Sequence, residues 1–248
     1  MIIFDEKYYA EKLLANGYKN EKYIIFDNII LVKYWKYLGI AEDKIRENLF
    51  NFMSQFQNLY NDDIIKSKIN KAIKVGMKYD LLYDVVVNIT TEELLIINKL
   101  NNIILQKMMF IFLVVWKFKG KPERFRISNT DIMKLANINV NNQNFWDCIY
   151  QLTQSELISM VEHRTKSYYK VNFVNSDDSE IVLTIDNFNN IIEQYLSYLE
   201  PDKYGSCVNC GVPILISNNR TKYCRSCWEE RERELWRESK RKIRNVQV

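Results

Sequence analysis

Two close pairs of cysteines near the end of the sequence constrain the fold more than any other feature. Cys207 and Cys210 have two residues between them, as do Cys224 and Cys227, and 13 residues separate the pairs. Two residues between thiolates let one backbone turn direct both sulfurs at one ion, and two such turns complete a tetrahedron. The spacing therefore predicts one structural Zn²⁺, because soft thiolates suit zinc and four protein ligands leave no position for substrate.

The alternative is that these cysteines form two disulfides or remain as free thiols. Four cysteines in two close pairs and a fifth, Cys148, alone are typical of a protein in a reducing compartment. We expect Cys148 to pack in a core. The charged residues Asp5 to Lys7 argue against a cleavable signal peptide. The apolar stretch Met108 to Trp116 falls short of the ~20 residues that a bilayer span requires. We therefore expect a buried helix and a cytoplasmic protein of a bacterial host cell.

Positive charge is concentrated at the C-terminal end. Residues 201–248 carry 11 Lys and Arg against 6 Asp and Glu, whereas the rest of the chain carries 24 against 25. Helical spacing places five cations on one side of the last predicted helix: Arg233, Arg237, Lys240, Arg241 and Arg244. Such a stripe predicts salt-dependent contact with a nucleic-acid backbone. The alternative is a solvated helix face with intrahelical pairs such as Glu229 with Arg233.

The first part of the sequence, residues 1–88, predicts a helical domain. Apolar residues recur at spacings of three and four, and glycines interrupt the pattern. The expected helices are Glu6 to Ala15, Ile24 to Leu38, Glu42 to Phe56 and Asp62 to Val75. The segments Ile29 to Gly39, Ala41 to Asn51 and Asp62 to Gly76 resemble the helical domain that follows the catalytic part of plasmid and phage primases. We expect this helical domain to recruit a partner.

The second part, residues 89–200, alternates helix and strand patterns. The expected helices are Thr91 to Phe118, Asp131 to Ala136 after an N-cap at Ser128, Asn144 to Ser155, and a last one capped by Asp186 and ending at Leu199. The expected strands are Arg124 to Ile127, a hairpin of Ile158 to Arg164 with Tyr168 to Val174, and Glu180 to Ile185 as a third strand. This order of elements resembles that of winged helix-turn-helix regulators, and so do the amino-acid sequences of residues 127–138 and 151–158.

That resemblance implies nucleic-acid contacts from two places. Asn141, Asn142 and Gln143 stand near the start of the presumed recognition helix, where amide side chains pair with adenine edges. The alternative is that these residues only form the turn and the helix cap. Arg164, Lys166 and Lys170 lie on the predicted wing and would contact phosphate or the minor groove. One departure is that residues 141–155 contain no Lys or Arg.

The third part, residues 201–248, holds the four cysteines. A strand at Val212 to Ile216 is expected to pair with Thr221 to Tyr223, and a helix is expected from Trp228. This unit resembles a zinc ribbon or treble clef that ends in a helix. The predicted fold class is therefore mainly α (α+β), with a helical bundle, a winged-helix domain bearing a β-hairpin, and a small zinc module.

No enzymatic site is predicted. His163 is the only histidine, no glycine-rich phosphate loop occurs, and no paired acidic motif suited to Mg²⁺ is found. The composite resembles proteins of phages and plasmids of low-GC bacteria, which implies work on nucleic acid in replication or transcription of a mobile element. We therefore predict a non-catalytic nucleic-acid-binding protein that is an accessory to one of these processes. The alternative is a phage-encoded inhibitor that binds a host nuclease or CRISPR effector, of the anti-CRISPR type. Neither hypothesis requires a membrane or a small-molecule substrate.

Overall fold

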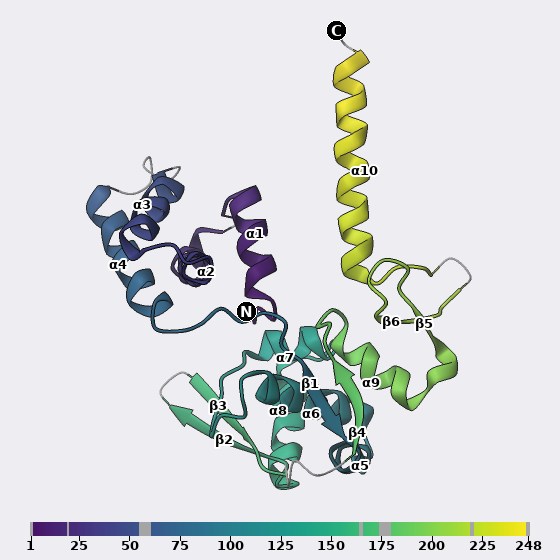
Figure 1. The fold of residues 1–248 in the computed structure, drawn as a ribbon. Coiled ribbons are helices and arrows are strands. Elements are labelled where there is room, and N and C mark those ends of the chain that lie inside the picture. The colour runs from purple at the N-terminus through teal and green to yellow at the C-terminus, as the bar shows by residue number, and fades with distance from the viewer. Residues whose placement is uncertain are drawn as a thin grey trace. The chain divides into compact units, whose positions relative to one another are not determined.

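The computed structural model describes residues 2–18, 20–54, 61–163, 166–173, 180–218 and 221–246, with the side chains of all of these but 162, 163, 166 and 241–246. The fold is mainly α, and the sheets formed by these residues are small and antiparallel (Figure 1). Contacts between residues divide the chain into two compact units, Ile3–Val85 and Val86–Val248. A separate third domain at residues 201–248 stays a prediction.

The first unit consists of helices around one apolar core. They are α1 (Glu6–Asn16), the 3₁₀ turn η1 (Glu21–Tyr23), α2 (Ile24–Tyr37), α3 (Glu42–Met53) and α4 (Asp62–Gly76). All four predicted helices are present, although α3 was expected to continue to Phe56, and residues 55–60 lie outside the described part. α2 packs closely on α4 because Gly76 has no side chain. A Cβ atom at Gly76 would lie 2.6 Å from Cβ of Val32.

A buried ion pair joins two helices of this unit. Lys33 of α2 donates to both carboxylate oxygens of Glu6 of α1, at 2.8 and 2.6 Å. Both side chains are about nine-tenths buried, with exposed fractions of 8% and 10%. The backbone N–H of Leu82 donates a further bond of 2.8 Å to Glu6. The carboxylate therefore also fastens the segment after α4 to α1.

A largely buried helix forms the centre of the second unit. α6 (Ile103–Phe118) has every side chain from Met108 to Val115 fully buried, as the apolar stretch predicted. The single helix expected over residues 91–118 is wrong, because α5 (Thr91–Asn98) ends before α6 begins. The Asn102 side chain accepts a hydrogen bond from Ile104 N at 2.8 Å and starts a new helix. No helix in the described part of the chain is long and apolar enough to cross a membrane.

A capping box begins α5, as the sequence predicted. Thr90 Oγ1 accepts from Glu93 N at 3.4 Å, and Glu93 Oε2 accepts from Thr90 N at 2.9 Å. We expect Thr90→Ala to lower the free energy of unfolding by about 1 kcal/mol, because one buried helix-end donor loses its acceptor. Urea denaturation followed by circular dichroism measures the change. An unchanged midpoint would show that the Thr90 hydroxyl does not stabilise this end of the helix.

Two short helices and a hairpin follow α6. α7 (Asn129–Leu135) is N-capped by Ser128 as expected, and α8 (Asn142–Gln154) is capped by Asn141. Strands β2 (Ile158–His163) and β3 (Lys166–Val171) form the predicted hairpin. The strand expected at residues 124–127 is reduced to one bridge, in which Phe125 and Tyr169 exchange two backbone hydrogen bonds of 2.8 Å.

The remaining strands pair differently from expectation. β4 (Ile181–Ile185) does not extend the hairpin but pairs with β1 (Val87–Thr90), so it returns to the start of this unit. α9 (Ile191–Leu199) begins later than expected, and Asp186 does not cap it. The residue immediately before α9 is Asn190, which has a left-handed conformation with φ of 52°. This left-handed residue leads directly into α9, and asparagine tolerates such a conformation better than most residues.

Candidate metal centre and basic helix

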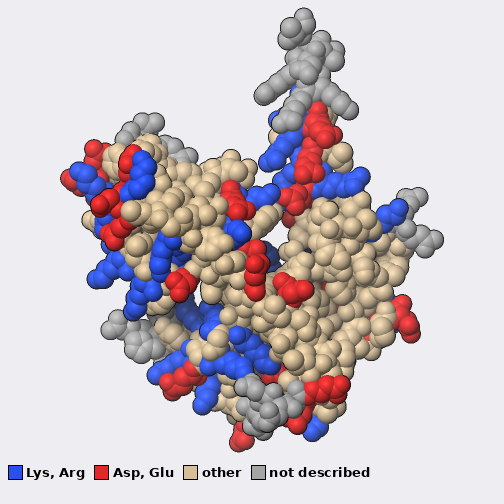
Figure 2. Space-filling view, in the orientation of Figure 1, with Lys and Arg blue, Asp and Glu red and all other residues tan. Residues whose placement is uncertain are grey.

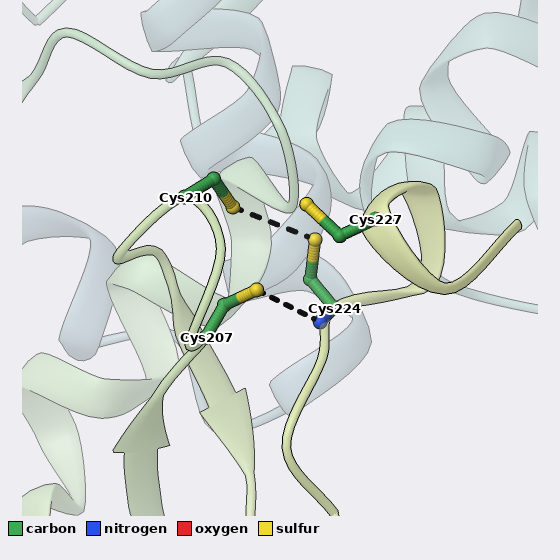
Figure 3. Close-up of side chains that lie close together, drawn as sticks. All are labelled: Cys207, Cys210, Cys224 and Cys227. Atoms are coloured by element: carbon green, nitrogen blue, oxygen red, sulfur yellow. Dashed lines mark hydrogen bonds between the residues drawn. The ribbon is translucent and has the colours of Figure 1, made fainter. Parts of the chain in front are cut away.

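The four paired cysteines converge on one point. Their sulfur atoms all lie within 4.8 Å of one another, and those of Cys210 and Cys224 are 3.6 Å apart. Figure 3 shows the four side chains pointing toward a shared centre from two loops and the start of a helix. Sulfurs about 2.3 Å from one tetrahedral ion lie roughly 3.8 Å apart. The cluster is therefore compatible with one metal site, and the donor set of four thiols fits a soft divalent ion.

Hydrogen bonds orient the sulfurs. Cys224 N donates to Cys207 Sγ at 3.3 Å, and the Asn209 side chain donates to Cys227 Sγ at the same distance. Burial raises the pKa of Cys207, but backbone N–H groups, that of Cys224 foremost, outweigh it and lower the pKa to about 6. Burial raises the pKa of Cys210. Thus one thiolate is stabilised by the protein, while a cation is needed to ionise the whole set.

The first cysteine pair lies in the turn of a hairpin. β5 (Tyr204–Ser206) pairs with β6 (Pro213–Leu215), and Gly211 N donates to Cys207 O at 2.9 Å within the turn. Gly211 has φ of 72°, a left-handed conformation that favours glycine. The expected pairing of residues 212–216 with 221–223 is wrong, because the partner strand precedes the cysteines. The cysteine turn itself therefore serves as the loop of the hairpin.

The second cysteine pair begins the final helix. α10 (Arg225–Val246) starts directly after Cys224, three residues earlier than expected, and Cys227 lies in its first turn. Cys224 O accepts from Trp228 N at 2.9 Å. The buried residues around the cluster form a small core: Cys207, Val212, Ile214, Cys224 and Cys227. Because this core is so small, a metal ion would supply much of the stability of the module.

The cations of α10 are exposed as far as the structure describes them. Every side chain from Arg231 to Lys240 is exposed, which includes Arg233, Arg237 and Lys240. Arg241 and Arg244 lie in α10, but their side chains fall outside the described residues. At 3.6 residues per turn the five positions fall within roughly 100° of the helix circumference. Figure 2 shows Lys and Arg side chains along this helix, interspersed with acidic ones.

Local pairing engages only part of this stripe. Arg225 forms an ion pair of 2.9 Å with Glu229, and Arg233 donates to the backbone oxygen of Glu229 rather than to its carboxylate. The Lys240 ammonium lies 3.7 Å from the centre of the Trp236 ring. The predicted ion pair of Glu229 with Arg233 is therefore replaced by one with Arg225. This leaves the guanidinium of Arg233 free of an acidic partner among the described residues.

The amide residues before α8 are partly engaged in the helix start. Asn141 accepts from Asn144 N at 2.8 Å as the N-cap, and Gln143 donates to Asp147 at 3.1 Å. Asn142 is exposed. The alternative role as a helix cap thus applies to Asn141. Asn142 and Gln143 lie at the surface.

The predicted wing cations are only partly described. Lys170 is exposed on β3, Lys166 lies in β3 with its side chain outside the described residues, and Arg164 lies outside them altogether. Two exposed cations beside the hairpin, Arg124 and Arg126, were not predicted as functional. Their alternation around the apolar Phe125 was the available signal. Asn209, which donates to a cluster sulfur, was also missed.

Comparison of the chain with protein-family models, curated proteins and solved structures finds no match. The resemblances to winged-helix regulators and to the primase-associated helical domain therefore stay predictions. Any functional conclusion depends on the geometry of the chain itself.

Proposed function

We propose that the protein is a non-catalytic nucleic-acid-binding protein, in which a zinc-stabilised module holds a basic helix against the phosphate backbone. The observation that carries the proposal is the cysteine cluster at the base of α10, followed by exposed cations on one side of that helix. Four sulfur ligands fill a tetrahedral shell, so Zn²⁺ would be structural and would not activate water.

The exposure of α10 supports a role in binding. A helix gains most of its stability by packing an apolar face, yet every described side chain from Arg231 to Lys240 is exposed. At the start of α10 the metal cluster would offset this lack of packing, because Cys224 and Cys227 hold the first turn of the helix. Exposed cations along such a helix gain affinity for a polyanion by releasing its counterions.

The order of elements in the second unit supports the same function. A central helix, two short helices and a hairpin follow one another as in winged-helix domains, which bind DNA in many regulators. The amides at the start of α8 remain candidates for base contacts. Since α8 carries no cation, we assign most of the electrostatic affinity to other surfaces.

A charge-removal experiment tests the proposal. We expect the triple variant Arg233→Gln, Arg237→Gln and Lys240→Gln to weaken binding of a fluorescent oligonucleotide at least tenfold at low salt. The slope of log K against log salt concentration should become shallower by about 2 to 3, because three phosphate contacts are lost. Fluorescence anisotropy over a series of KCl concentrations provides both values.

A matched control removes the same charge elsewhere. Lys66, Lys71 and Lys74 are exposed on α4 of the first unit, and their replacement by Gln changes the net charge equally. This control should bind like the wild-type protein. Equal loss in both variants would indicate non-specific attraction, and a wild-type protein that retains no nucleic acid at low salt would refute the proposal.

A protein-binding function is the second candidate, and one observation favours it. α10 also exposes three large apolar side chains, Trp228, Leu235 and Trp236, with exposed fractions of 50%, 54% and 60%. Exposed aromatic residues are enriched at protein interfaces. Such a protein, for example an inhibitor of a host nuclease or CRISPR effector, would co-purify with one host protein after nuclease treatment and would show little salt-sensitive binding to nucleic acid.

A further inference from the structure

The hairpin of the second unit has one mostly buried and one mostly exposed face, and on the exposed face Ser159 and Tyr168 are half-buried. Ile158, Tyr169 and Val171 are at most 4% exposed, and so is Phe125, which pairs with Tyr169 as a short third strand. Successive residues of a strand point to opposite faces. The residues between them therefore form an outer face, which consists of Arg124, Arg126, Ser159, Val161, Tyr168 and Lys170.

The pairing register places these side chains in two rows. Phe125 lies opposite Tyr169, so Arg126 neighbours Tyr168 and Arg124 neighbours Lys170 across the strands. On the other side of β3, Val161 pairs with Tyr168 and Ser159 pairs with Lys170. Neighbouring strands are about 4.8 Å apart, and residues of one face repeat about every 6.8 Å. Arg126 therefore lies beside Tyr168, and Lys170 and Arg124 lie one repeat further along the same face.

These cations have no acidic partner within the part of the chain that the structure describes. Arg124, Arg126 and Lys170 are all exposed, and none takes part in an ion pair or side-chain hydrogen bond. Figure 2 shows Lys and Arg side chains near the position of β2 and β3 in Figure 1. By contrast, the exposed side of α8 carries amides, Asp147 and Tyr150 but no cation. Positive charge thus lies on the sheet rather than on α8.

We infer that the outer face of the β2–β3 sheet binds single-stranded nucleic acid, with Arg124, Arg126 and Lys170 on the phosphates and Tyr168 stacked on a base. The inference rests on the proposed function and deepens it, because it names a second site and the kind of strand bound there. Aromatic rings flanked by cations on an open surface are the usual platform for unpaired strands.

The aromatic ring on this face favours a single strand over a duplex. In an intact duplex the bases are stacked on one another, so a side chain that enters a groove reaches only the base edges. Tyr168 would then have no base face to stack on. An unpaired strand can turn its bases toward the sheet, so that ring and cations act together.

Two sets of substitutions in the full-length protein test the site with a fluorescent 20-nucleotide thymidine strand and its duplex with adenosine. Arg124→Gln, Arg126→Gln and Lys170→Gln together should flatten the salt slope for the single strand by about 2. Tyr168→Leu should weaken single-strand binding roughly 5- to 100-fold, while Tyr168→Phe should bind like the wild type. Duplex affinity should change less than threefold in the tyrosine variants.

Other outcomes separate the two proposals. If the wild type binds the strand but these variants bind equally well, the sheet site is refuted while nucleic-acid binding by α10 stands. Binding of the duplex alone would refute the sheet site in the same way, and binding of neither probe would refute both. Circular dichroism and metal content of each variant confirm that the fold is retained, and Val161→Thr serves as a neutral change on the same face.

Discussion

Replacing Cys224 with serine is expected to abolish stoichiometric metal binding and to unfold α10. Cys224 contacts both cysteines of the other pair: its backbone N–H donates to Cys207 Sγ, and its sulfur lies 3.6 Å from that of Cys210. Structural zinc sites contribute on the order of 10 kcal/mol to the stability of small modules. Without this site the exposed α10 has little tertiary packing to hold it helical.

Elemental analysis and hydrogen exchange measure the two effects together. The wild type should contain about one zinc per chain, and α10 should exchange more slowly in it than in the Cys224→Ser variant. Cys148→Ser is the matched control, because this buried thiol of α8 lies outside the cluster. A variant that keeps its metal, or an α10 that stays protected after a chelator strips the metal, would contradict the structural role of the site.

The convergence of the four cysteines was predictable because its signal is local. The spacing within each cysteine pair fixes the geometry of one turn, and the two turns then need only be brought together. The hairpin beside it was not predictable in the same way. The partner of β6 is Tyr204–Ser206, a three-residue strand that contains a glycine and has no alternation of polar and apolar residues to mark it.

Helix capping explains why the single helix predicted over residues 91–118 is wrong. Apolar residues continue through residues 91–118, so periodicity alone favours one helix. The structure divides it at residues 99–102, where Asn102 caps α6 and Gln106 donates to Leu100 O at 2.7 Å. These polar side chains form hydrogen bonds with backbone groups that would otherwise continue the helix. Hydrophobic periodicity gives no information about such bonds.

The outer face of the β2–β3 sheet depends on a contact that sequence patterns hardly show. The sequence predicted a strand at residues 124–127, but it did not predict that Phe125 would pair with Tyr169 of β3 through a single bridge. Only that bridge brings Arg124 and Arg126 beside Tyr168 and Lys170. The candidate cations of α10, by comparison, follow from helical spacing alone and required no tertiary information.

In the first unit, we expect Lys33→Met to lower the free energy of unfolding by about 3 to 5 kcal/mol. The substitution leaves the carboxylate of Glu6 buried without its cation, and removing one partner of a buried ion pair is strongly destabilising. Urea denaturation followed by the fluorescence of Trp35, a buried residue of α2, reports on this unit. Lys44→Met is the control, because Lys44 and Glu47 are each 57% exposed and their pair should contribute no more than about 1 kcal/mol.

A double variant distinguishes the cost of an unpaired charge from the value of the pair itself. Glu6→Leu with Lys33→Met removes both charges, so the double variant should be more stable than the Lys33→Met protein. Some loss should remain, because Leu82 N donates to Glu6 at 2.8 Å and would lose its acceptor. If Lys33→Met alone were as stable as the wild type, water would have to reach Glu6, and the pair would not hold α1 against α2.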